Sequence, residues 1–283
     1  MSAKSIKSRI NELTKELNDS TVCGQRVQIS VVQKRNGVAL HGMTFVEKDP
    51  SPTVYLEQIV KSPDTTLAEI EASVNSILNE QVNVCLEINS IINNWRENIR
   101  IGVLSTKENK KYLKSAVKKP LLDLTAYLYL ELDGASTVVR TEMLKSFDAD
   151  RKTVFEQAMS NMLRVYRWSS ILDIMQKIDE AQACGLPDVG MSVLTNDTRI
   201  FGAGCIANND ILASIADKLN SDLILLPSSV HEVIVLKANE DSSYSELSDM
   251  IKEINATQVQ KEEVLAEHPY KFIRKTGCLV ATF

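Results

Sequence analysis

LILLPSSVHEVIVL, residues 223–236, contains two apolar runs separated by the polar insert 227–232. Short runs of Leu, Ile and Val bounded by turn-forming residues are typical of buried strands. The insert therefore crosses between two strands of a core sheet. It holds hydroxyls, an imidazole and a carboxylate beside that rigid core, so we expect functional side chains at this crossing.

Further segments typical of strands lie on both sides of this stretch. The further predicted strands are 27–34, 38–46, 99–104, 124–132, 136–140, 191–195, 199–203, 270–275 and 278–282. Leu124 to Leu132 alternate in polarity, which predicts a half-buried strand. Turn pairs such as Asn36-Gly37 and Asp133-Gly134 join consecutive strands, and these pairs favour hairpins. Residues 53–60 fit either a third N-terminal strand or a single helical turn.

Helical periodicity occurs between these hairpins. The predicted helices are 4–18, one after the capping box of Thr66 and Glu69, one after Asp150, 166–183, 211–219 capped by Asn209, and one after the capping box of Ser243 and Glu246. Amphipathic helices alternating with hairpins predict an α+β fold of mostly antiparallel sheets with packed helices.

The helix after Asp150 has a wide apolar face that is rich in methionine. Its members are Val154, Phe155, Ala158, Met159, Met162 and Leu163. Flexible methionine side chains suit a groove that receives a partner, but packing against a core is the commoner role of such a face. We favour the core.

The length of 283 residues exceeds the usual domain size of about 100–150 residues, which favours two domains. The polar, aperiodic stretch Asn93 to Asn98 is the candidate junction. We expect an N-terminal helix-hairpin-helix α+β unit at 1–97 and a C-terminal α+β domain at 98–283.

The net charge of −5 and the pI near 5.4 argue against a protein devoted to nucleic acid. Six lysines nevertheless lie within 107–119, and they fit either a phosphate-binding face or a solvated flank. We favour the flank, so a nucleic-acid partner is not expected. Because no segment approaches the ~20 apolar residues of a membrane span and no signal peptide is evident, we expect a cytoplasmic protein without a membrane partner.

Metal and cofactor sites have no sequence support. The histidines are far apart in the sequence, and the odd number of scattered cysteines fits buried thiols better than disulfides or a zinc site. These residues are His41, His231 and His268, with Cys23, Cys85, Cys184, Cys205 and Cys278. Phosphate-loop and dinucleotide fingerprints do not occur. We expect neither a metal nor a cofactor.

The insert contains the residue types of a catalytic triad in Ser228, Ser229, His231 and Glu232. On an extended segment, however, Ser229 and His231 share one side while Ser228 and Glu232 share the other. No Gly-x-Ser-x-Gly elbow presents a serine. We prefer hydroxyl caps and a hydrogen-bonded histidine to catalysis. The candidate binding residues are Pro227, Ser228, Ser229, His231, Asn196 and Arg199.

Six segments, in order along nearly the whole chain, carry a resemblance to a known family. They are Asn36-Gly37-Val38 with His41-Gly42, Pro52 to Leu56, Thr141 to Leu144, Val193 to Asn196, Leu226 to Val233, and Asn255 to Val259. The chain resembles a family of uncharacterised bacterial proteins, a domain of unknown function from Gram-positive anaerobes and their mobile elements. Its most specific motif here is Leu-Pro-Ser-Ser-Val-His-Glu-Val at 226–233. The resemblance implies one continuous architecture and no particular reaction.

Three functional hypotheses follow. The first is a non-enzymatic protein-binding or regulatory module of mobile-element or phage origin. The second is a hydrolase that uses Ser228 or Ser229 with His231. The third is nucleic-acid binding through residues 107–119. The identity of a protein partner and the oligomeric state are left open.

Overall fold

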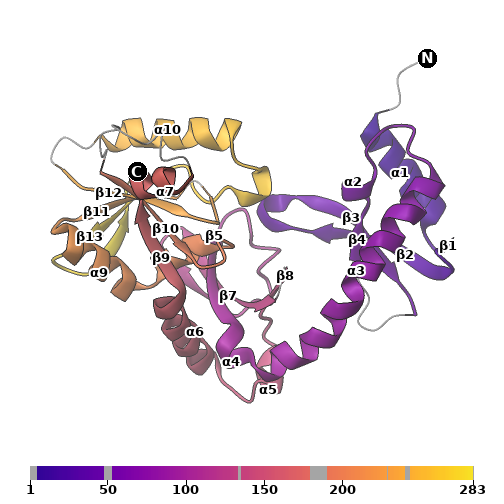
Figure 1. Cartoon of the computed structure of the whole chain (residues 1–283), viewed down its shortest axis with the longest axis horizontal. Helices are drawn as coiled ribbons and strands as arrows, with labels where there is room; N and C mark the ends of the chain where they lie inside the picture. The colour runs from indigo at the N-terminus through magenta and orange to yellow at the C-terminus, as the bar shows by residue number, and fades with distance from the viewer. Residues whose placement is uncertain are drawn as a thin grey trace. The chain divides into compact units, whose positions relative to one another are not determined.

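The computed structural model describes residues 5–47, 53–132, 135–178, 190–227, 229–239 and 243–282. The chain forms two compact units, Met1–Ile91 and Ile92–Phe283 (Figure 1). Every strand pair in the described residues is antiparallel, and helices pack on the sheets. The predicted α+β class is confirmed.

The first unit is a sheet with the strand order β1-β2-β3-β4, covered by helices. Its elements are α1 (Ile6–Leu17), β1 (Thr21–Val22), β2 (Gln25–Gln33), η1 (Arg35–Gly37), β3 (Ala39–Phe45), β4 (Thr53–Tyr55), α2 (Leu56–Ile59) and α3 (Leu67–Asn93). Leu13 of α1, Val27 and Met43 of the sheet, and Ile70 and Val74 of α3 are fully buried in one core. Residues 53–60 thus contain both a short strand and a helical turn.

Local turn and cap chemistry in this unit agrees with the sequence. Asn36 and Gly37 have positive φ angles of 52° and 68°, as the turn between β2 and β3 requires. The Thr66 backbone N–H donates to the Glu69 carboxylate (2.8 Å), and the Glu69 N–H donates to the Thr66 hydroxyl (3.3 Å). The predicted hairpin and capping box are confirmed.

The second unit contains the remaining elements. They are α4 (Trp95–Asn98), β5 (Ile99–Ser105), β6 (Lys118–Leu121), β7 (Leu124–Leu132), β8 (Ala135–Val138), α5 (Met143–Ser146), α6 (Arg151–Val165), β9 (Tyr166–Ser170), α7 (Ile171–Ile178), β10 (Met191–Asn196), η2 (Gly202–Ala207), α9 (Asn209–Leu219), β11 (Leu223–Leu226), β12 (Val233–Lys237), α10 (Tyr244–Thr257), η3 (Lys261–Glu263), β13 (Tyr270–Ile273) and β14 (Cys278–Ala281).

The larger sheet of this unit has the order β14-β13-β11-β12-β10-β9 in the described residues. The two apolar runs of 223–236 are its central strands, paired from Leu223 with Lys237 to Leu226 with Ile234. Helix α10 packs through Ile251 on Ile224 and Leu226. Figure 1 shows α10 on one side of these strands and α9 on the other. Both faces of β11 are therefore covered, and all four of its residues are buried.

The smaller sheet is organised around β7. Strand β5 pairs with one edge of β7, while β6 and β8 pair with successive parts of β7. The expectation of a half-buried strand is wrong, because residues 124–130 are all buried. Tyr129 packs edge-on against Phe201, the residue before η2, and its hydroxyl donates to the Ile200 carbonyl (3.2 Å). The alternating polarity reflects tyrosines that are buried in this packing. The turn 133–134 lies outside the described residues.

Three local expectations in the second unit are wrong. Tyr166–Ser170 is the edge strand β9, and helix α7 begins only at Ile171. The rest of the predicted helix 166–183 lies outside the described residues. Residues 199–203 do not form a strand, because the chain turns and enters the buried 3-10 helix η2 at Gly202. The cap of α9 is Asn208, whose side-chain oxygen accepts from the Asp210 N–H (3.0 Å), and not Asn209.

The boundary between the units lies at Ile91 and Ile92, ahead of the expected boundary at 97 and 98. Trp95 belongs to the core of the second unit. Its ring stacks on Phe147 with the centroids 5.1 Å apart, and its indole N–H donates to the Phe147 carbonyl (3.2 Å). Trp95 is buried although the segment 93–98 around it is polar, so composition alone does not predict its burial.

Candidate functional site

The crossing from β11 to β12 is held by backbone hydrogen bonds to two other segments. The Val230 N–H donates to the Glu263 carbonyl (2.9 Å), and the Ala203 N–H donates to the Val230 carbonyl (3.2 Å). The Thr195 hydroxyl donates to the carbonyl of His231 (2.8 Å). The insert is therefore pinned between η2, η3 and β10.

Both ring nitrogens of His231 have partners in the protein. The Phe201 backbone N–H donates to Nδ1 (3.3 Å), so Nδ1 is an acceptor and carries no proton in the neutral ring. Nε2 then carries the proton, and it lies 3.3 Å from a carboxylate oxygen of Glu263. The ring also stacks on Phe201, with centroids 5.6 Å apart. These contacts fix the ring.

The serines of the insert are placed differently from a triad. The Ser229 hydroxyl accepts from the backbone N–H of His231 (3.0 Å), as in a local turn. A general base needs a free nitrogen lone pair directed at the nucleophile. Among the described residues no hydroxyl hydrogen-bonds to the His231 ring, while Ser228 lies outside them. Catalysis by Ser228 or Ser229 with His231 stays a prediction.

A polar cleft of about 520 Å³ lies beside this crossing, and we name it the β9–β10 cleft. Its lining residues come from β9, α7, β10, the turn after β10, and the residue before β12. They are Arg167, Ser169, Ile171, Ile174, Val193, Thr195, Asn196, Asp197, Arg199 and Glu232. Three residues singled out in the sequence, Asn196, Arg199 and Glu232, therefore meet at one site. Pro227, Ser229 and His231 are not part of its lining.

Strand register explains why these side chains share one face. Arg167 pairs with Thr195, and Ser169 pairs with Val193, so alternate residues of the two strands lie side by side. Arg167 and Ser169 were not among the predicted site residues, because a helix was predicted over this segment. The alternation Tyr166, Arg167, Trp168, Ser169 was the available signal for an edge strand.

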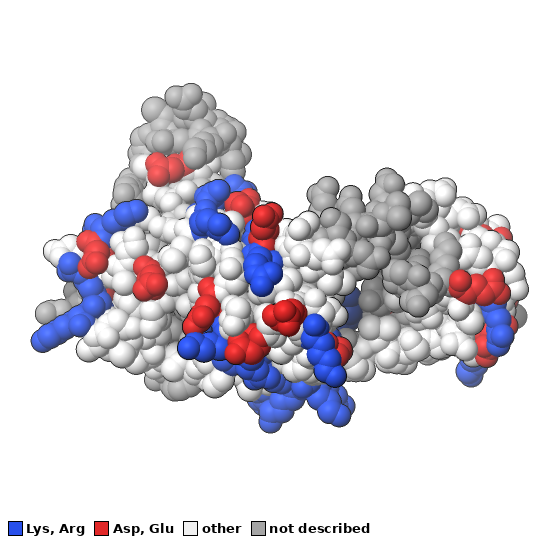
Figure 2. All heavy atoms as spheres, turned by 90° about the horizontal axis from the view of Figure 1, so that it is seen from below, with Lys and Arg blue, Asp and Glu red and all other residues white. Residues whose placement is uncertain are grey.

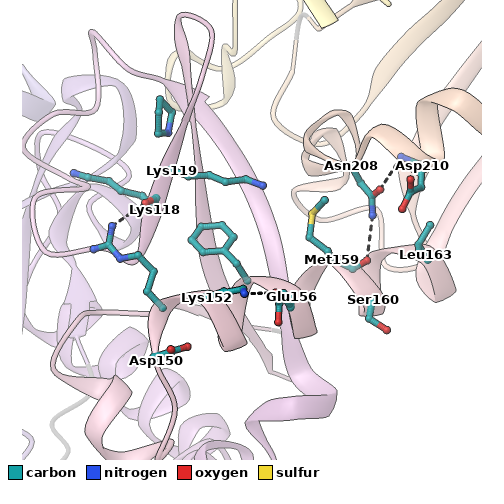
Figure 3. Close-up of a pocket in the computed structure, with 13 residues that line it drawn as sticks. Lys118, Lys119, Asp150, Lys152, Glu156, Met159, Ser160, Leu163, Asn208 and Asp210 are labelled. Atoms are coloured by element: carbon teal, nitrogen blue, oxygen red, sulfur yellow. Dashed lines mark hydrogen bonds and ion pairs between the residues drawn. The ribbon is translucent and has the colours of Figure 1, made fainter. Parts of the chain in front are cut away.

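A second, more open concavity of about 900 Å³ runs along α6, and we name it the α6 groove (Figure 3). Phe155, Met159 and Leu163 line it from one stripe of the helix, while Lys118, Lys119 and Pro120 line it from β6. Val154, Ala158 and Met162 of the same helix are fully buried in the core. The apolar face expected for this helix is thus divided between the core and the groove, and 43% of Leu163 is exposed.

Hydrogen bonds hold both walls of the α6 groove to the helix. Arg151 donates to the carbonyl of Lys118 (3.2 Å), which ties the start of α6 to β6. The Asn208 amide donates to the carbonyl of Met159 (3.1 Å) and so ties α6 to the start of α9 (Figure 3). The groove is preformed by these contacts.

Basic residues near the α6 groove are only partly available to a ligand. Lys118 Nζ donates to the carbonyl of Leu113. Lys119 Nζ lies 5.3 Å from the Phe155 ring centroid, and burial lowers the pKa of its amine, since desolvation disfavours the charged form. Figure 2 shows Asp and Glu side chains interspersed with Lys and Arg on the visible face. Nucleic-acid binding through 107–119 stays a prediction.

The described residues contain no group of three or more His, Cys, Asp or Glu side chains placed to hold a metal ion. They also contain no helix with the length and apolar character of a membrane span. Of the cysteines, Cys23, Cys205 and Cys278 are free thiols, and burial raises the pKa of Cys205 to about 12. The side chains of Cys85 and Cys184 lie outside the described part.

Comparison with curated proteins and with solved structures finds no match to the chain. Comparison with protein-family models finds one, described as a family of unknown function (DUF5688), which matches residues 6–274. This range includes all the residues that line the β9–β10 cleft and the α6 groove. Because the match spans most of the 283 residues, the chain belongs to this family of unknown function.

Proposed function

We propose that this protein is a protein-binding module, and that the α6 groove receives an amphipathic segment of its partner. The observation that supports this proposal is the groove itself, in which Phe155 is buried, Met159 is half-buried and Leu163 is exposed between two fixed walls. Grooves of this kind bind helices whose apolar residues recur at i and i+4. Flexible methionine accommodates varied apolar side chains.

Charge at one end of the groove supports an acidic partner segment. Asp150 is engaged as the cap of α6, and Glu156 lies 3.8 Å from Lys152. Among the described residues, Lys119 has no carboxylate within ion-pair distance. A partner carboxylate placed there would offset the desolvation of its ammonium group. The expected partner segment therefore carries apolar residues with an acidic residue beside them.

Selection from a displayed library of helical peptides tests this proposal even though the natural partner is unidentified. Wild type should enrich peptides with an apolar pair at i and i+4 and an adjacent Asp or Glu. The affinity of an enriched peptide is then measured by fluorescence anisotropy with wild type and Leu163→Asp. Because a buried charge opposes apolar packing, we expect at least about tenfold weaker binding to Leu163→Asp.

Met250→Asp is the matched control, because Met250 lies on α10 outside the groove and is 46% exposed, close to the 43% of Leu163. It should leave the affinity unchanged. Lys119→Glu should weaken the binding of the acidic peptide. Replacing the acidic residue of the peptide by Lys should restore binding to that variant. Failure to enrich such peptides, or equal effects of Leu163→Asp and Met250→Asp, would contradict the proposal.

Analytical ultracentrifugation tests whether the groove is filled by a second copy of this chain or by a different protein. A wild-type dimer that Leu163→Asp converts to monomer would show that a second copy fills the groove, and would contradict a heterologous partner. Steeply salt-dependent retention on DNA, lost in Lys119→Glu, would favour the nucleic-acid hypothesis instead.

A further inference from the structure

The β9–β10 cleft brings together four charged side chains that do not pair with one another. Arg167 and Arg199 supply cations, while Asp197 and Glu232 supply anions. Among the described residues, no ion pair joins any of the four. Opposite charges that line one cleft without pairing are available to a ligand that carries both signs.

The position of Arg199 is enforced by the fold. Its φ of 57° lies in the left-handed region, which costs free energy for a residue with a side chain. The Arg199 N–H donates to the carbonyl of Asn196 (3.3 Å), and the Asn196 amide donates to the carbonyl of Ile200 (2.7 Å). Asn196 thus acts as a positioning residue that holds the turn bearing Arg199.

Arg167 is anchored through only one of its guanidinium nitrogens. Nη1 donates to the carbonyls of Tyr166 (3.0 Å) and Arg164 (3.5 Å). In the part of the chain that the structure describes, Nε and Nη2 make no hydrogen bond. A guanidinium held in this way presents its remaining N–H donors to a carboxylate without further ordering of the side chain.

The rest of the cleft is suited to an apolar group. Ile171 and Ile174 of α7 and Val193 of β10 line it beside the charges. Its volume of about 520 Å³ lies within the range of about 300–1,000 Å³ that is usual for small-molecule sites. The cleft therefore offers cationic, anionic and apolar contacts within the space of a small ligand.

We infer that the β9–β10 cleft binds a small zwitterion with an apolar side chain, either a free amino acid or a dipeptide. The guanidinium groups of Arg167 and Arg199 hold its carboxylate. The carboxylates of Asp197 and Glu232 hold its ammonium group, and the isoleucines contact its side chain. This site is separate from the α6 groove and does not depend on the function proposed there.

Isothermal titration calorimetry tests this with leucine, leucyl-leucine and leucyl-phenylalanine as probes of the full-length protein. Wild type should bind at least one of them at millimolar concentration or below. N-acetylation of each probe removes its ammonium group, and C-terminal amidation removes its carboxylate. Both derivatives are made for leucine and for the two dipeptides. Each cap should weaken binding to wild type about tenfold, as expected for the loss of one charge-assisted contact.

The variants Arg199→Gln and Glu232→Gln test whether Arg199 contacts the carboxylate of the ligand and Glu232 contacts its ammonium group. Arg199→Gln should weaken the free probe about tenfold but leave the amide unaffected, because the amide already lacks the group that Arg199 binds. Glu232→Gln should weaken the free probe and leave the acetylated form unaffected. Arg26→Gln, an exposed arginine outside the cleft, should change neither. Absence of binding by all three probes, or equal losses for free and capped forms in both variants, would overturn the inference.

Discussion

Gly202 is the position where one added methyl group should disturb the candidate site most directly. A Cβ at this residue would lie 2.1 Å from the Thr195 hydroxyl oxygen and 2.6 Å from both the Asn196 nitrogen and the His231 carbonyl oxygen. Ordinary contacts begin near 3.4 Å. Two of the three atoms belong to the backbone, so Gly202→Ala must displace η2, the end of β10, or the crossing before β12.

Two terms set the expected magnitude. Overpacking of a buried position costs about 1–3 kcal/mol. Moving the Thr195 hydroxyl breaks its 2.8 Å hydrogen bond to His231 in a buried region, which costs about 1–3 kcal/mol more. We therefore expect Gly202→Ala to lower the free energy of unfolding by about 2–6 kcal/mol, a large part of the about 5–15 kcal/mol that is usual for a domain.

Urea denaturation followed by tryptophan fluorescence measures this loss, because both tryptophans, Trp95 and Trp168, belong to the second unit. Gly277→Ala is the matched control. Its φ is 65°, and a Cβ there would meet no atom within 4 Å, so only the left-handed backbone should cost about 1–2 kcal/mol. A loss for Gly202→Ala no larger than that for Gly277→Ala would refute the packing argument.

Two further predictions concern the same unit. Burial raises the pKa of the Cys205 thiol to about 12 in the folded chain, whereas the thiol of the unfolded chain loses its proton near pH 9. The contribution of this thiol to the free energy of unfolding should therefore be full below about pH 9 and fall as the pH rises toward 12. Replacing Cys205 by Ala should reduce that slope by up to about 1.4 kcal/mol per pH unit, measured by urea denaturation at several pH values, and an unchanged slope would contradict the assignment. Trp95→Phe should keep the ring stacking on Phe147 but leave the carbonyl of Phe147 without its donor, at a cost of about 1–3 kcal/mol. Thermal denaturation measures this loss of stability. A loss below about 0.5 kcal/mol, as is usual for substitutions at the protein surface, would contradict the prediction.

Local chemistry in the sequence determined most of the secondary structure and the fold class. The turn at Asn36-Gly37, the caps at Asp150 and Ser243, and the capping box of Thr66 and Glu69 act over two to four residues, so each can be identified from its own short segment. The apolar runs of 223–236 identified the central strands for the same reason, because buried strands need apolar side chains on both faces.

The candidate site was only partly accessible from the sequence. Asn196, Arg199 and Glu232 were singled out there, and all three line the β9–β10 cleft. Arg167 was missed, since a strand at the edge of a sheet is specified by its pairing with β10 rather than by strong local preference. Treating the insert as an extended segment also could not predict that Phe201 and Glu263 contact the two ring nitrogens of His231.

Periodicity, turns and caps are local properties, and they were sufficient to predict a mostly antiparallel α+β chain with two central strands and a polar crossing between them. Long-range packing, in contrast, determines which side chains meet in the β9–β10 cleft and which face of α6 stays open. Those outcomes depend on contacts between residues far apart in the chain, such as Arg167 with Thr195 and Met159 with Asn208. Such contacts are set by the packing of whole elements, which no short stretch of sequence encodes.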